Sequence, residues 1–122
     1  FVNLSVIRDA FSNNDNVIYR VRGVLFFASF HHFLDKFLFD KDPHNVVVDF
    51  EEARIVDHSG VEAIDKLISY YPKNRTITLK SLSRDSKFLL NQSFVGSNVI
   101  FEEGKNVPDY KIVTNRVIER YE

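Results

Sequence analysis

The order of hydrophobic patterns along the chain constrains the fold most strongly. Two segments near the amino terminus alternate apolar and polar residues, and Asn13-Asn14-Asp15-Asn16 between them has the composition of a turn. After them, segments with the period of an amphipathic helix alternate with short apolar runs. The expected order is therefore strand, strand, helix, strand, helix, strand, helix, strand, and the first two strands should form an antiparallel hairpin.

The apolar residues also bound the expected elements. The hairpin strands alternate at Val2, Leu4, Val6 and at Val17, Tyr19, Val21. A first helix is expected from Ser29 to Phe39, where one helical face carries Phe30, Phe33, Leu34, Phe37 and Leu38. Val46 to Phe50 is expected to be the central strand, with protein on both of its faces. The remaining elements are a helix from Ser59 to Tyr71, a strand from Thr76 to Lys80, a helix opening at Ser83, a strand at Val99-Ile100-Phe101, and an ambiguous tail from Tyr110 to Tyr121.

These elements predict the fold class. A strand-helix-strand crossover is right-handed and makes its two strands parallel. If the crossovers progress in one direction, the helices gather on one face of the sheet. Alternation in three of the strands supports one covered face, because a sheet covered on both faces would be apolar throughout. We therefore expect an α/β fold with a mixed β-sheet and helices mainly on one face.

Composition limits the classes of protein that fit. The 122 residues, 44% hydrophobic and 27% charged, are typical of one compact domain over 1–122. Sixteen basic against seventeen acidic residues give a net charge of −1, which argues against nucleic acid as a partner. The longest apolar run, 24–28, is far shorter than the roughly 20 residues of a membrane-spanning helix. Because the chain starts at Phe1, we expect a piece of a longer protein.

The turn between the central strand and the second helix carries the strongest functional motif, Asp57-His58-Ser59-Gly60. Loops after the carboxyl ends of parallel strands commonly hold functional residues. Ser59, followed three residues later by Glu62, predicts a capping box with Ser59 as an exposed N-cap. A phosphoryl group on Ser59 would meet the positive end of the helix, whereas Asp57 and Glu62 would repel it. Phosphorylation is therefore expected to change the surface that a partner meets.

This strand, turn and helix resemble the STAS domain, which is shared by anti-sigma factor antagonists and the cytoplasmic ends of SulP-type sulfate and anion permeases. In the antagonists the turn is Asp-Ser/Thr-Ser-Gly, and a partner kinase phosphorylates the serine before the glycine, which is Ser59 here. His58 departs from that pattern. Two other stretches resemble the permease branch: Tyr19 to Ser29, where the family usually has proline in place of Val24, and Pro108 to Thr114.

The resemblance implies a non-catalytic regulatory domain of a SulP-like sulfate or anion transporter, on the cytoplasmic face of the inner (plasma) membrane. Its implied partners are the transmembrane domain of the parent transporter and a protein that docks on the Ser59 turn and the following helix. Some STAS domains bind nucleotides near this loop, so Asp57, His58, Gly60 and Glu62 are candidate partner-binding or nucleotide-binding residues. The chain has no Gly-rich phosphate cradle, and no cofactor is expected. The alternative is a free-standing anti-sigma factor antagonist.

Enzymatic and metal-binding interpretations fit less well. Asp57, His58 and Ser59 are the residue types of a hydrolase triad, but three consecutive residues cannot form its chain of hydrogen bonds. His31 and His32 would point about 100 degrees apart on a helix. Asp40, Asp42 and Glu51 match part of a calcium-loop spacing, which Pro43 and Asn45 contradict. We therefore expect neither an enzyme nor a metal site. Phe26 and Phe27 are adjacent, so one of the two rings on a strand would face outward and mark a contact surface.

Overall fold

Five strands form one mixed sheet in the computed structural model, which describes residues 3–10, 15–91, 98–104 and 112. The strands are β1 (Ser5–Ala10), β2 (Asn16–Leu25), β3 (Asn45–Ile55), β4 (Thr76–Lys80) and β5 (Val99–Glu102), and they are ordered β1-β2-β3-β4-β5 across the sheet. β1 and β2 are antiparallel, and every later neighbouring pair is parallel. The predicted hairpin and the central place of the Val46 strand are both confirmed.

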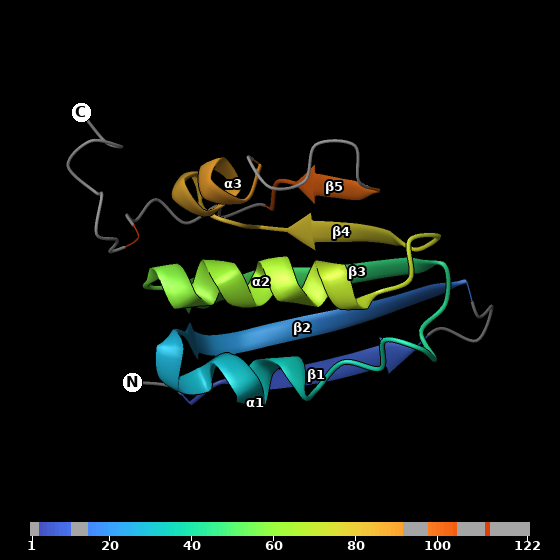
Figure 1. Ribbon diagram of the computed structural model, residues 1–122, viewed down its shortest axis with the longest axis horizontal. Helices are drawn as coiled ribbons and strands as arrows, with labels where there is room; N and C mark the ends of the chain where they lie inside the picture. Colours follow the sequence, from blue (N-terminus) through green and yellow to red (C-terminus); the bar gives the residue numbers. More distant parts are fainter. Residues whose placement is uncertain (1–2, 11–14, 92–97, 105–111, 113–122) are drawn as a thin grey trace.

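The helices lie on one face of this sheet (Figure 1). They are a short 3₁₀ turn η1 (Phe27–Ser29), α1 (Phe30–Leu34), α2 (His58–Tyr70) and α3 (Arg84–Asn91). The predicted α/β class with helices on one face is therefore confirmed. The expectation that protein covers both faces of the central strand is wrong. Val46, Val48 and Phe50 are buried under the helices, whereas Val47 and Asp49 on the opposite face are only half-buried.

The hydrophobic core lies between the helices and the covered face of the sheet. Its most completely buried side chains come from β2, β3, β4 and the inner faces of α1, α2 and α3. Each large apolar side chain contributes about 1.5–3 kcal/mol when it leaves water. α2 supplies Val61, Ala63, Ile64 and Leu67, the helical period predicted from the sequence. This packing fixes α2 across the sheet and so positions the turn before it.

The first helix is shorter than the sequence predicts. α1 ends at Leu34, and the Phe37 amide donates to the Leu34 carbonyl at 3.4 Å in a tighter turn. The Leu38 amide donates to the hydroxyl of Tyr19 at 3.0 Å, so it makes no helical bond. Phe33, Leu34 and Phe37 are buried as expected, but the Leu38 side chain is 42% exposed. A buried tyrosine on β2 therefore ends a helix whose apolar stripe continues in the sequence.

Some predictions fall outside the described residues: Val2, Asn13 and Asn14, and nearly all of the permease-like stretch and tail from 108 to 121. Within that tail the structure describes Ile112 alone. Its side chain is fully buried, and its amide donates to a carboxylate oxygen of Asp85 in the first turn of α3 at 3.1 Å. The predicted strands over 76–80 and 99–101 and the helix that follows Ser83 are all confirmed.

Candidate functional site: the turn between β3 and α2

The side chain of Asp57 caps α2. Asp57 has an extended backbone, and its Oδ1 accepts a hydrogen bond from the Gly60 amide at 2.9 Å. The helix begins at His58, so the predicted capping box with Ser59 as N-cap is wrong. Aspartate caps a helix as well as serine does. The Val56 amide still pairs with the Leu25 carbonyl of β2, so Asp57 is the point at which the chain turns from the sheet into the helix.

Asp57 also joins two connections that follow neighbouring strands. Its second oxygen, Oδ2, accepts a hydrogen bond from the backbone amide of Phe27 at 3.1 Å. Phe27 opens η1 directly after β2, and α2 follows β3, so one carboxylate holds both segments at the carboxyl edge of the sheet. The sequence singled out Asp57 and Phe27 separately but did not predict their contact, because nothing in the local pattern links positions thirty residues apart.

Gly60 allows α2 to begin close to the sheet. A Cβ at this position would lie 2.7 Å from the Leu25 carbonyl oxygen and 2.8 Å from Cγ2 of Ile55. Both distances are shorter than real Cβ contacts, and the first involves backbone that cannot move aside easily. The glycine of the motif is therefore explained by close packing of the first helical turn against β2 and β3.

The predicted site residues differ in their exposure. His58 and Glu62 are exposed, Asp57 and Ser59 are half-buried, and Gly60 is buried. Ser59 is the second residue of α2, at the end where backbone amides lack helical acceptors. The turn thus brings the whole motif to one edge of the sheet, with Ser59 half-buried in the first turn of α2. Phe27 beside it is 71% exposed, the largest exposed fraction among the large hydrophobic side chains of the described chain.

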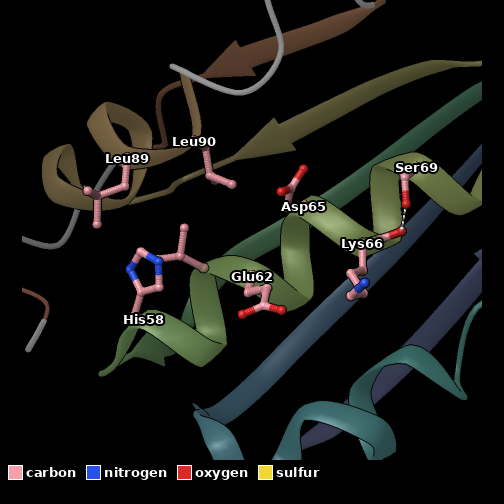
Figure 2. Close-up of a pocket in the computed structure, with 8 residues that line it drawn as sticks. His58, Glu62, Asp65, Lys66, Ser69, Leu89 and Leu90 are labelled. Atoms are coloured by element: carbon pink, nitrogen blue, oxygen red, sulfur yellow. Dashed lines mark hydrogen bonds between the residues drawn. The ribbon is translucent and has the colours of Figure 1, made fainter.

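A groove of about 380 Å³ runs along α2 from this turn toward α3 (Figure 2). It is lined by His58, Val61, Glu62, Asp65, Lys66, Ser69, Leu89 and Leu90. Asp65 points from α2 toward α3, whose Leu90 faces it across the groove. Burial raises the pKa of Asp65 above its usual value, and the negative charge of Glu62 adds to this effect against an opposing influence of Lys66. The groove combines apolar and charged walls, which suits contact with a polypeptide.

The geometry does not assemble a catalytic triad. Both oxygens of Asp57 accept backbone amides, from Gly60 and Phe27, and this places the carboxylate against the backbone and away from any role in orienting His58. His31 and His32 are both exposed in α1. Within residues 3–10, 15–91, 98–104 and 112, no three His, Asp or Glu side chains are grouped so that they could hold a metal ion. The same residues include no helix long and apolar enough to cross a membrane.

A buried polar cluster lies at the end of the sheet away from the turn between β3 and α2. The sequence did not predict it. Asp42 is 1% exposed, and its carboxylate accepts hydrogen bonds from Arg8, from Tyr19 at 2.7 Å and from Tyr71 at 2.6 Å. The bond to Asp42 raises the pKa of Arg8, and burial followed by the bond to Asp42 raises that of Tyr19. In the sequence, Asp42 stood out only as part of a calcium-loop spacing that Pro43 and Asn45 contradict. An inward-facing tyrosine on a strand, whose hydroxyl needs a partner, was the available clue.

Comparison with known proteins agrees with this architecture. The family model described as STAS domain matches residues 8–103. A "Putative sulfate transporter YbaR" from Bacillus subtilis (strain 168) is 36% identical over 75 residues, which cover 61% of this chain and 16% of that protein. The chain therefore corresponds to a small part of this relative.

Two solved structures share the fold. The STAS domain of an anti-sigma factor antagonist from Rhodobacter sphaeroides is 25% identical, with a TM-score of 0.59 over 90% of this chain and 96% of that one. The anti-sigma factor antagonist SpoIIAA in its unphosphorylated form is 13% identical, with a TM-score of 0.61 over 84% of this chain and 90% of that one. The second likeness concerns the fold alone. With a family match that spans most of its length, a mixed sheet covered on one face and a capped turn after β3, this chain belongs to the STAS domain family.

Proposed function

We propose that this chain is a non-catalytic regulatory and interaction domain of a SulP-like sulfate or anion transporter, on the cytoplasmic face of the inner (plasma) membrane. The observation that carries the proposal is the 36% identity to a protein described as a sulfate transporter. Because that match covers 16% of the relative, the transport pathway would lie in the rest of the parent protein. This domain would act on it through protein contacts.

The turn after β3 is the surface best suited to those contacts. Asp57, His58 and Glu62 lie near the half-buried Ser59 in the sequence of this turn, and Gly60 sets how closely the helix approaches the sheet. The groove between α2 and α3 continues this surface, with Leu89 and Leu90 on the α3 wall and mainly polar and charged residues on the α2 wall. The sequence has no Gly-rich loop that could cradle the phosphates of a nucleotide here. We therefore assign these residues to a protein partner, together with the transmembrane domain of the parent transporter.

A free-standing anti-sigma factor antagonist is the second candidate, and the 25% identity to the Rhodobacter sphaeroides antagonist favours it. The reading frame upstream of Phe1 separates the two. About ten or more apolar spans before this domain would support the transporter, as the resemblance to SulP-type permeases implies. A start codon immediately before Phe1 would support the antagonist.

Transport by the parent protein, with and without residues 1–122, tests the main proposal. We expect removal of the domain to change anion flux, abundance or assembly, because a regulatory domain acts on the protein to which it is attached. Flux per molecule at matched abundance separates regulation from stability. If flux, abundance and assembly are all unchanged, the domain is not a regulator of transport.

Ser59 is proposed as the phosphoacceptor of this surface. Incubation of the chain with cell extract and ATP is expected to add the mass of one phosphoryl group, since Ser59 is only half-buried and lies in the first turn of α2. Intact-mass analysis of the wild type and of Ser59→Ala measures the addition, with Ser69→Ala as a control on the same helix. A mass gain that persists in Ser59→Ala, or no gain at all, would contradict this role.

A further inference from the structure

The two oxygens of Asp57 link the functional turn to the most exposed aromatic ring of the described chain. Oδ1 holds the Gly60 amide at 2.9 Å and Oδ2 holds the Phe27 amide at 3.1 Å. The ring of Phe27 is 71% exposed and rests edge-on against Phe26, with 5.4 Å between the ring centroids. The backbone of Phe27 is thus held by the same side chain that caps α2.

A phosphoryl group on Ser59 would compete with Asp57 for this position. Ser59 is the second residue of α2, and Gly60, whose amide Asp57 caps, is the third. A phosphate carries a charge of about −2 and is stabilised by the free amides at a helix start. Two anions that share the same few amides repel each other, and repulsion between them is strong where water is partly excluded. The carboxylate is therefore the group displaced, since it is the weaker acceptor of the two.

We propose that Asp57 couples negative charge on Ser59 to the position of Phe27. When the phosphate takes the helix-start amides, Asp57 releases the Phe27 amide and the beginning of η1 loosens. An exposed aromatic ring next to the modified serine then changes position, so that one event alters both the charge and the apolar part of the docking surface. This inference rests on the proposed function, which supplies phosphorylation as the natural source of the charge.

The neighbouring bonds of η1 provide an internal reference. The Phe26 amide donates to Oγ of Ser29 at 3.1 Å, and that hydroxyl also donates to the Val24 carbonyl at 2.9 Å. None of these bonds involves Asp57. Release of Asp57 should therefore affect the Phe27 amide selectively, whereas general unfolding of the turn would expose the Phe26 and Phe27 amides together.

Amide hydrogen exchange, measured by NMR on the 122-residue chain with phosphoserine encoded at position 59, tests the coupling. The Phe27 amide is expected to exchange about tenfold faster than in the unmodified chain, the effect of one lost bond to a charged acceptor. Phosphoserine at position 69, on the opposite end of α2, is the matched control and should leave the rate within about twofold. An unchanged Phe27 rate, or an equal rise at Phe26 and Phe27, would overturn the proposal.

Two variants of Asp57 test whether this side chain is the link between Ser59 and the Phe27 amide. Asp57→Ala removes both bonds, so the Phe27 amide should already exchange fast and respond no further to phosphoserine at position 59. Asp57→Ser keeps one oxygen for the N-cap and should give the same fast exchange with a stability close to wild type. If phosphoserine still accelerates exchange in these variants, Asp57 is not the link. Because the phosphate is encoded, failure here is distinct from a failure to find phosphorylation or transport regulation in cells.

Discussion

Replacing Asp42 with alanine is expected to destabilise the domain by about 3 kcal/mol, at the lower end of the range for removing one partner from a buried ion pair. The carboxylate is the shared acceptor for Arg8, Tyr19 and Tyr71. Without it, two buried hydroxyls and a guanidinium lose an acceptor that water cannot easily replace. Arg8 is 29% exposed at its side chain, so partial hydration limits the cost.

The exposed pair Arg20–Asp9 is the matched control for this prediction. Both side chains are more than half exposed, so Asp9→Ala should change the free energy of unfolding by about 0–1 kcal/mol. Urea unfolding followed by circular dichroism measures both variants under the same conditions. Equal effects of Asp42→Ala and Asp9→Ala would show that the buried cluster does not stabilise the fold.

Replacing Gly60 with alanine is expected to cost about 2 kcal/mol of stability, because overpacking a close contact typically costs 1–3 kcal/mol. The new methyl group would meet the Leu25 carbonyl and the Ile55 side chain at the distances given above. The better helix propensity of alanine offsets part of that cost. The strain would fall on the first turn of α2, so the variant should also shift the NMR signals of Asp57 and Ser59.

Ser69→Ala is the control for Gly60→Ala, since Ser69 is exposed near the other end of α2. It should change the free energy of unfolding by no more than about 0.5 kcal/mol. Urea unfolding again gives the measurement. A Gly60→Ala variant as stable as wild type would mean that the glycine does not set the height of the helix above the sheet.

The sequence was sufficient to predict the order of elements, the hairpin and the covered face of the sheet. Those features follow from hydrophobic periods that each segment carries by itself, such as Val61, Ile64 and Leu67 on α2. The motif from Asp57 to Gly60 was also located correctly, between a parallel strand and the helix that crosses back over the sheet.

The errors arose where a tertiary contact decided between two locally acceptable structures. Both Asp57 and Ser59 can cap a helix. Asp57 is the N-cap because Val56 still pairs with β2 and because the Phe27 amide donates to the Asp57 carboxylate. Likewise, α1 could have continued through Leu38, but the hydroxyl of Tyr19 took the Leu38 amide. The cluster around Asp42 joins segments far apart in the chain, and local patterns carry no information about such contacts.

Anion flux through the parent transporter carrying Ser59→Glu, compared with Ser5→Glu at equal abundance in the membrane, tests the central claim most directly. If the turn after β3 regulates transport through its charge, Ser59→Glu changes the flux per molecule by about twofold or more, whereas Ser5→Glu, on exposed β1 and outside the groove, leaves it unchanged. Equal flux in wild type and both variants, with normal assembly, would contradict the assignment of this turn as the regulatory surface.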